Sequence, residues 1–189
     1  MAHIRCFIAV EIPDEVKERL WSVKGELEEI APEVRWVRKE GMHLTLKFLG
    51  NVEESRLGEI EEAIAEAVSG LGEIEAEVAS TGAFPKADFA RVVWAGVIGE
   101  VKKIRELQRR IENAMSSLGF EREGRSFVPH ITLGRIKRPG RNRKMAAKLA
   151  AMSEYSFGSF TIREVVLFKS QLHPEGAIYT ALARIPLKG

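Results

Sequence analysis

Residues 127–135 read Phe127-Val128-Pro129-His130-Ile131-Thr132-Leu133-Gly134-Arg135, and this stretch decides the fold because its central tetrapeptide occurs twice. The first copy, His43-Leu44-Thr45-Leu46, lies 87 residues earlier and continues into Lys47-Phe48-Leu49-Gly50. Each copy reads His-aliphatic-Thr-Leu inside an apolar run with β-branched or aromatic neighbours. This pattern indicates a β-strand.

Alternate side chains of a strand share a face. His43 and Thr45 are therefore predicted to point to one side of the sheet, and Leu44, Leu46 and Phe48 to the other. The second copy repeats this pattern. Each strand is thus expected to bury its aliphatic residues and to offer an imidazole and a hydroxyl on its opposite face.

The same offset of 87 residues relates other parts of the chain. It carries strand 5–10 onto 92–97, the helix after Pro13 onto the one after Glu100, the helix after Asn51 onto the one after Arg138, and strand 74–80 onto 161–167. The order strand, helix, His-Thr strand, helix, strand therefore occurs twice. This predicts one pseudo-two-fold domain, 1–189, with related halves of about 1–90 and 91–189, whose two His-Thr strands face each other across one cleft.

Periodicity and turn signals predict the remaining elements. The expected helices are Asp14–Ile30, Glu53–Val68, Val101–Leu118 and a short one ending at Met152. The other expected strands are His3–Val10, Val34–Val37, Ile74–Ser80, Arg91–Ile98, Tyr155–Ile162, Val165–Gln171 and Ile178–Pro186, with residues 81–85 as a connection.

The composition excludes several classes of protein. A chain of 189 residues suits a single well-buried domain. Its charged fraction of 30% is typical of proteins from hot environments. The one cysteine, Cys6, excludes an internal disulfide and a cysteine-rich metal site. Apolar runs are too short to cross a membrane and the start lacks a signal-peptide pattern, so we expect a cytoplasmic protein. A monomer is also expected.

One segment just after the second copy is strongly basic. It carries seven cations and no acid: Arg135, Lys137, Arg138, Arg141, Arg143, Lys144 and Lys148. A solvated helix face explains such a run, and so does a rim that faces phosphates, since clustered cations attract polyanions independently of sequence.

Two imidazoles that face one cleft can divide acid and base work near neutral pH. A threonine two residues further on can donate its hydroxyl to a phosphate oxygen. The pattern therefore favours phosphodiester chemistry without a metal. A zinc site needs more ligands than two lone histidines, and neither a Gly-x-Ser-x-Gly motif nor a nucleotide-binding glycine fingerprint is present. A purely structural role for both pairs is the remaining alternative.

The two tetrapeptides resemble the paired His-x-Thr-x motifs of the two-histidine (2H) phosphoesterase superfamily. Within it, the chain is similar to the 2′-5′ RNA ligase group, also called RNA 2′,3′-cyclic phosphodiesterases. The likeness covers nearly the whole chain and includes residues 5–10 with Pro13, residues 43–50, 82–85, 91–96, 129–135 and 170–172, then Gly176 and Tyr179.

The resemblance implies a bilobal α+β fold, with antiparallel sheets lining a central cleft and helices on the outside. It implies hydrolysis of an RNA 2′,3′-cyclic phosphate to a 2′-phosphate, with no metal or cofactor. His43 would protonate the departing 3′ oxygen, His130 would accept a proton from water, and Thr45 and Thr132 would hold the phosphate oxygens. The implied partner is RNA with 2′,3′-cyclic phosphate ends, tRNA fragments among them, and no membrane.

The resemblance also points to Arg135 as a substrate contact. A regular strand would turn Arg135 away from His130, unless a bulge at Gly134 re-aims it. Three aromatic residues near the motifs, Trp36, Phe84 and Phe127, are candidates for stacking on the terminal base, although core packing is the commoner role of such residues.

Three other functions remain open from the sequence. The same site could run in reverse and join RNA ends through a 2′-5′ linkage. The chain could be a non-catalytic module that binds RNA ends, although binding alone does not need two titratable rings. A small cyclic nucleotide or cyclic ADP-ribose phosphate is another conceivable substrate.

Overall fold

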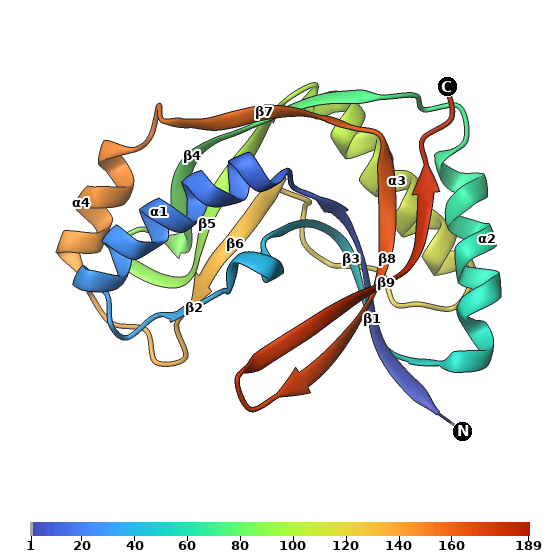
Figure 1. Cartoon of the computed structure of the whole chain (residues 1–189), viewed down its shortest axis with the longest axis horizontal. Helices are drawn as coiled ribbons and strands as arrows, with labels where there is room; N and C mark the ends of the chain where they lie inside the picture. Colours follow the sequence, from blue (N-terminus) through green and yellow to red (C-terminus); the bar gives the residue numbers. More distant parts are fainter. Residues whose placement is uncertain (1) are drawn as a thin grey trace.

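The computed structural model describes residues 2–189, and its strands join into one antiparallel sheet (Figure 1). The strands are β1 His3–Glu11, β2 Arg35–Trp36, β3 His43–Glu53, β4 Ile74–Lys86, β5 Phe89–Gly99, β6 His130–Arg135, β7 Ser156–Ile162, β8 Glu164–His173 and β9 Gly176–Pro186. The helices are α1 Asp14–Ile30, α2 Leu57–Val68, α3 Val101–Ser117 and α4 Arg143–Ala151, with short 3-10 helices at Lys39–Gly41 and Glu54–Arg56.

The strand order is symmetric about the junction of β3 and β6. It runs β7-β4-β5-β6-β3-β1-β8-β9, with the short β2 paired to β6. Thus β5 flanks β6 as β1 flanks β3, and β4 flanks β5 as β8 flanks β1. The starts of α1 and α3 are 87 residues apart, as are the starts of β3 and β6. The predicted α+β class with antiparallel strands is confirmed.

Three details of the predicted layout are corrected. Residues 81–85, expected as a connection, belong to β4, because the β4–β5 ladder continues to Lys86 and Phe89 before the chain turns. The expected separate sheets are one sheet, joined where Leu44 of β3 pairs with Ile131 of β6. The counterpart of β4 in the symmetric order is β8, so the predicted match of 74–80 to 161–167 spans the end of β7 and the start of β8.

The helices cover one face of this sheet. On α3 the buried positions Ile104, Leu107, Ile111 and Met115 recur at helical spacing. They share one core with the inward residues of the strands and of α1, α2 and α4. Burying each such aliphatic side chain stabilises the fold by about 1.5–3 kcal/mol.

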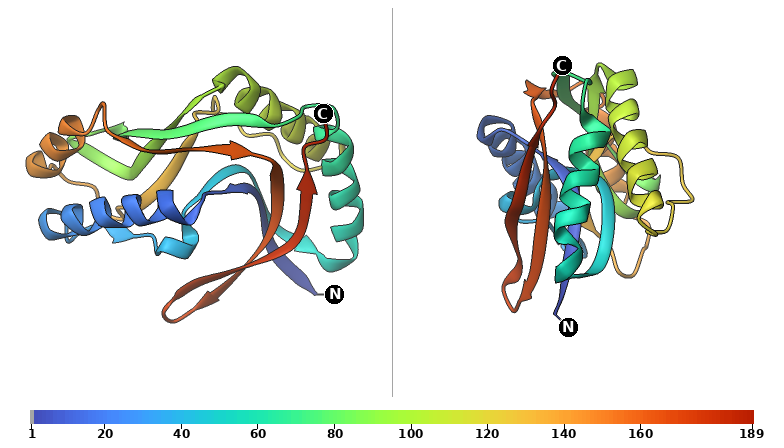
Figure 2. Two further views of the ribbon diagram at one scale, coloured as in Figure 1. Left: turned by 45° about the horizontal axis from the view of Figure 1, so that its top comes forward. Right: turned by 90° about the vertical axis from the view of Figure 1, so that its right-hand side faces the viewer.

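The opposite face of the sheet carries a separate, smaller apolar cluster. It consists of Phe7, Ala9, Val166 and Phe168, with Tyr179 and Ala181 packed against it. The sheet curls strongly in the views of Figure 2, and the long β8–β9 hairpin projects from it. We refer to this side of the sheet as the open face.

A β-bulge in β3 changes which side chains reach the open face. Ala9 pairs with Thr45, but Ile8 pairs with Lys47, so Leu46 is an extra residue. A bulge shifts the alternation of the residues that follow it. Lys47 therefore points into the core, whereas Phe48 lies opposite Phe7 on the open face.

The prediction that Phe48 shares the side of Leu44 and Leu46 is therefore wrong. Its side chain is 63% exposed, and its ring lies 6.0 Å from that of Phe7. A strict alternation of faces holds only while the ladder is regular, and the bulge at Leu46 ends that regularity.

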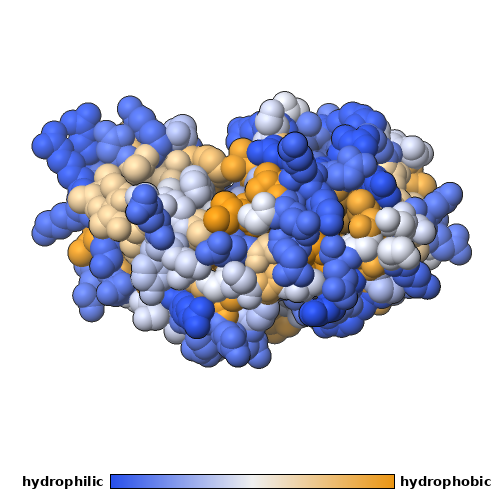
Figure 3. Space-filling view, turned by 90° about the horizontal axis from the view of Figure 1, so that it is seen from above, coloured by the Kyte–Doolittle hydropathy of each residue, from blue (hydrophilic) through white to orange (hydrophobic). Residues whose placement is uncertain are grey.

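The outer surface reflects the high charged fraction. Seen from above, hydrophilic side chains dominate the outline of the molecule, and apolar ones are visible in patches between them (Figure 3). Within residues 2–189, no helix combines the length and apolar character needed to span a bilayer.

Candidate active site

The two His-Thr pairs meet on the open face at the junction of β3 and β6. The Leu44–Ile131 pair is antiparallel, so continuing its register sets His43 opposite Thr132 and Thr45 opposite His130. All four side chains point away from the helix-covered core, because their neighbours Leu44 and Ile131 are fully buried in it. Diagonal neighbours in such a ladder lie roughly 7–8 Å apart. The two imidazoles are thus spaced to reach one phosphate between them.

His43 is enclosed by aromatic rings. Its ring centroid lies 4.7 Å from that of Phe168, 5.4 Å from that of Tyr179 and 5.8 Å from that of Phe7. The residue is only 7% exposed. These contacts fix the plane of the imidazole and leave little water around it.

His130 is held from two sides. The ring of Phe84 stands perpendicular to it at a centroid distance of 5.2 Å. Its Nδ1 lies 2.6 Å from the carbonyl oxygen of Val128. Because a carbonyl oxygen only accepts, Nδ1 must carry the hydrogen and donate it. In the neutral ring this leaves the lone pair of Nε2 free, as a general base requires.

The same arrangement recurs in the other half. His43 makes a backbone hydrogen bond with Gly41, which stands two residues before it, as Val128 stands two residues before His130. In both halves a backbone group two residues before the histidine therefore favours the protonated ring.

Both imidazoles have lowered pKa values. Burial lowers the pKa of His43 from 6.5 to about 4, with the charge of Lys17 acting in the same direction and Glu11 and the Gly41 bond opposing. Burial also lowers the pKa of His130, helped by the nearby Arg135 and opposed by the bond to Val128. In the free protein at neutral pH, both rings are therefore neutral.

Arg135 reaches the open face through a second bulge. In the β5–β6 ladder Trp94 pairs with Thr132 but Val93 pairs with Gly134, so Leu133 is extra. Arg135 then pairs with Val92, on the side of Trp94 and Thr132. The bulge thus removes the difficulty that strand alternation raised for this arginine, and its charge acts on His130.

The predicted aromatic residues divide between the two faces. Phe84 contacts His130 as described above. The structure does not bring Trp36 to the open face, because it pairs with Gly134 and packs against the core. Phe127 also packs against the core, and its carbonyl oxygen accepts a hydrogen bond from Arg105.

Sequence reasoning missed several aromatic residues of the open face, including Phe7 and Phe168 beside His43. Phe48 and Trp94 are the two whose placement is least expected. Strand alternation assigns Phe48 to the core, because the bulge at Leu46 has no clear signal in the sequence. Trp94 lies opposite Thr132, and its ring packs 5.3 Å from that of Phe84. Trp94 also lies over Gly82, where a Cβ atom would come within 2.4 Å of the indole. The glycine at position 82 is the signal that could have indicated this close approach.

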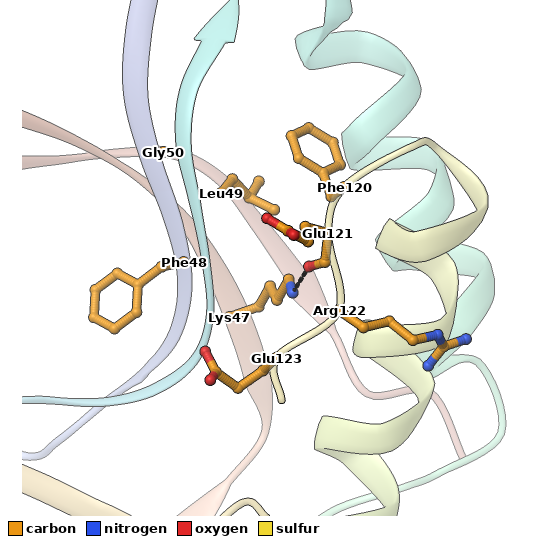
Figure 4. Close-up of a pocket in the computed structure, with 8 residues that line it drawn as sticks. All are labelled: Lys47, Phe48, Leu49, Gly50, Phe120, Glu121, Arg122 and Glu123. Carbon is orange, nitrogen blue, oxygen red and sulfur yellow. Dashed lines mark hydrogen bonds between the residues drawn. The ribbon is translucent and has the colours of Figure 1, made fainter. Parts of the chain in front are cut away.

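A pocket of about 280 Å³ lies on the other side of β3 and holds none of the four residues. Its lining comes from residues 47–50 and 120–123. Lys47 projects into it and donates to the carbonyl oxygen of Glu121, whereas Phe48 points to the opposite side of the strand (Figure 4). Lys47 also forms a buried ion pair with Glu112 at 2.7 Å. The ammonium group of Lys47 at this pocket is therefore already bound by other groups of the protein.

Most cations of the basic segment after β6 have no acidic side chain as a partner among residues 2–189. Lys148 lies 3.7 Å from Glu26, and the other cations of the run make no ion pair within the described part of the chain. No group of three or more His, Cys, Asp or Glu side chains in that part is arranged to hold a metal ion.

A family model and curated relatives both match nearly the whole chain. The family model described as LigT like Phosphoesterase matches residues 10–94 and 98–179. A protein of Archaeoglobus fulgidus named RNA 2′,3′-cyclic phosphodiesterase is 36% identical over 179 residues, covering 95% of this chain and 98% of its own. A protein of the same name from Methanothermobacter thermautotrophicus is 33% identical over 177 residues, covering 94% and 95%.

Solved structures share the fold. A crystal structure of a Thermus thermophilus protein superposes with a TM-score of 0.81 at 26% identity, covering 98% of this chain and 99% of that one. Escherichia coli LigT in complex with 3′-AMP superposes with a TM-score of 0.78 at 22% identity, over the full length of both chains.

Proposed function

The chain belongs to the LigT-like phosphoesterase family, and from this premise we propose that it hydrolyses RNA 2′,3′-cyclic phosphate ends to 2′-phosphates. Relatives at about one-third identity carry the name of that activity. The observation that supports the proposal most directly is the register of β3 and β6, which sets two imidazoles and two hydroxyls around one point.

His130 is the proposed general base. Its Nε2 is free because Nδ1 donates to Val128, and its lowered pKa keeps it neutral before reaction. It would take a proton from water as the water oxygen bonds to phosphorus. The expected contribution of such a base is about 10²–10⁴-fold in rate.

His43 is the proposed general acid, which must be protonated when the P–O3′ bond breaks. In the free protein burial disfavours that state. An anionic phosphate beside the ring favours the imidazolium, so we propose that substrate binding brings a proton to His43. This proton then passes to the departing 3′ oxygen and leaves the phosphate on O2′.

Thr45 and Thr132 are proposed to donate their hydroxyls to the two non-bridging oxygens. Each threonine lies opposite the histidine of the other strand in the extended register. The two hydroxyls would therefore hold the phosphate along one diagonal, and the two imidazoles would act on it along the other. Arg135 would contact the substrate from the end of β6, while Phe48 and Phe84 offer rings for the terminal base.

The test uses an oligoribonucleotide that ends in a 2′,3′-cyclic phosphate, incubated with the protein and a chelator. We expect a 2′-phosphate product, and loss of turnover by at least about 10²-fold in His43→Ala and in His130→Ala. His173→Ala, on the exposed end of β8, is the matched control. A 3′-phosphate product, or full activity in either histidine variant, would overturn the mechanism.

The same geometry would serve ligation if an RNA 5′-hydroxyl takes the place of water as the attacking group, with the 3′ oxygen again leaving as the protonated hydroxyl. Adding an oligonucleotide with a free 5′-hydroxyl to the same assay tests this. The expected product carries a 2′-5′ linkage and depends on both histidines.

A further inference from the structure

Arg35 stands directly opposite Arg135 at the edge of the open face. The short strand β2 pairs with β6 so that Arg35 faces Arg135 and Trp36 faces Gly134. Trp36 packs against the core, so the alternation of the strand turns Arg35 to the open face. Residues directly opposite each other in an antiparallel pair share a side of the sheet.

Neither guanidinium is neutralised by the protein. Within residues 2–189, neither Arg35 nor Arg135 has a carboxylate partner or a side-chain hydrogen bond. The next cations along the chain differ in this respect. Arg38 donates to the carbonyl oxygen of Ala177 at 2.9 Å, and Lys39 forms an ion pair with Glu18.

Two unpaired like charges directly opposite each other destabilise a sheet. An anion placed between them converts that repulsion into two attractive, charge-assisted contacts. The arginine pair therefore has the electrostatic properties of an anion-binding site.

The pair is displaced from the reacting position. Thr132 and Arg135 are separated by two ladder steps and the bulged residue, which is roughly 7 Å along the strand. The cyclic phosphate would lie between the two histidines, so the arginine pair would meet a different phosphate. In RNA the nearest other negative charge is the phosphodiester on the 5′ side of the terminal nucleoside.

We propose that Arg35, together with Arg135, binds this penultimate phosphodiester and makes oligoribonucleotide ends the preferred substrate class over cyclic mononucleotides. This inference rests on the proposed function. Beyond the pair, the exposed cations Lys137 and Arg138 follow in the chain, which continues the positive charge in the direction that the rest of the RNA would take.

The test isolates the charge of one phosphate. Two dinucleotides ending in a 2′,3′-cyclic phosphate are compared, one with the natural internal phosphodiester and one with a neutral methylphosphonate in its place. For each enzyme variant the ratio of kcat/KM for the two substrates is measured. Charged hydrogen bonds of this kind correspond to about tenfold or more, so we expect the wild-type ratio to favour the natural linkage by that factor.

The variants decide the role of Arg35. Arg35→Gln should lower the ratio towards one, with Arg135 supplying what preference remains, and Arg35→Lys should restore part of the loss. Lys102→Gln, the same charge change on the exposed side of α3, should leave the ratio as in the wild type. An unchanged ratio in Arg35→Gln overturns the proposal. So does an equal loss on both substrates, which would place Arg35 at the reacting phosphate or in the fold. If the wild type hydrolyses neither dinucleotide, the proposed function itself fails.

Discussion

Leu46 and Leu133 occupy the same position in the two His-aliphatic-Thr-Leu copies, and each is the extra residue of a β-bulge. The bulges turn the residue two places further on to the open face. In one half that residue is Phe48, and in the other it is Arg135. One structural device, used twice, therefore places an aromatic ring on one side of the two histidines and a cation on the other.

Phe48→Ala tests the aromatic side. The ring is 63% exposed and contacts Phe7, so its removal leaves the core intact. Stacking on a base contributes about 1–3 kcal/mol, and we expect kcat/KM to fall roughly 5–150-fold, mainly through KM. Trp21→Ala, a change to another exposed aromatic residue on α1, is the control. Unchanged kinetics in Phe48→Ala would assign the ring to another role.

Gly134→Ala tests the packing that supports Arg135. A Cβ atom at this position would come within 2.5 Å of Val34 and 2.8 Å of Trp36. Overpacking of this kind costs about 1–3 kcal/mol, and we expect the free energy of unfolding to fall by that amount in a urea titration. Gly124→Ala, where nothing lies within 4 Å, should change stability little. Equal stability of both variants would contradict the close contact.

The buried ion pair of Lys47 and Glu112 holds β3 against α3. Lys47→Met should destabilise the protein by about 3–5 kcal/mol, because it leaves a buried carboxylate without its partner. The double change with Glu112→Met should recover most of that loss, since neither charge is then buried alone. Denaturant unfolding of the two variants measures this, and a double variant as unstable as the single one would show that the pair is not the cause.

Much of the fold could be predicted because the chain repeats its pattern. Equal spacing of the two tetrapeptides and of the helices that precede them predicted the repeated order, and the paired motifs predicted the family that the comparisons confirm. The register of Leu44 and Ile131 could not be predicted, since it arises from contacts between distant segments. The site positions of His43 and His130 were expected from the motifs, but their lowered pKa values depend on burial in the folded chain.

The bulges show why strand alternation in the sequence does not always predict which face of the sheet a side chain occupies. Lys47, which alternation would leave on the side of His43, is buried against α3, and Phe48 takes the exposed position instead. The β2–β6 pair was also out of reach, because two residues carry too little periodicity to specify a partner strand. The sequence therefore did not indicate that Arg35 lies beside Arg135, which follows only from the pairing of β2 with β6.

His43 should make the stability of the protein depend on pH. Its pKa is lowered from 6.5 to about 4 in the folded state, so below pH 6.5 the unfolded chain binds a proton that the folded protein does not. Stability is therefore fully present above pH 6.5 and is lost as the pH falls towards 4. Between about pH 7 and about pH 4.5 this contributes a loss of about 2–3 kcal/mol.

The variant His43→Gln isolates that contribution, because all other titrating groups remain. Urea unfolding at about pH 7 and at about pH 4.5 should show that the variant loses about 2–3 kcal/mol less stability than the wild type. His173→Gln, a change to an exposed histidine, should behave as the wild type. Equal losses in all three proteins would contradict the buried, neutral state of His43.

The pH dependence of the enzyme kinetics should also reflect the lowered pKa values of His43 and His130. The pH profile of kcat/KM reflects the free enzyme, and that of kcat reflects the enzyme–substrate complex. Because the pKa values of both histidines are lowered in the free protein, we expect the optimum of kcat/KM below pH 6.5. The substrate's negative charge favours both imidazolium forms, so the profile of kcat should lie at higher pH.

Lys17→Met sharpens this prediction, because the charge of Lys17 helps to lower the pKa of His43. Removing that charge should raise the pKa of His43 and move the kcat/KM profile to higher pH, with a smaller change in the profile of kcat. Lys102→Met, which removes a distant exposed cation on α3, should leave both profiles in place. Identical pH dependence of kcat and kcat/KM in the wild type would mean that substrate binding brings no proton to the site, and His43 could then not serve as the acid in the proposed way.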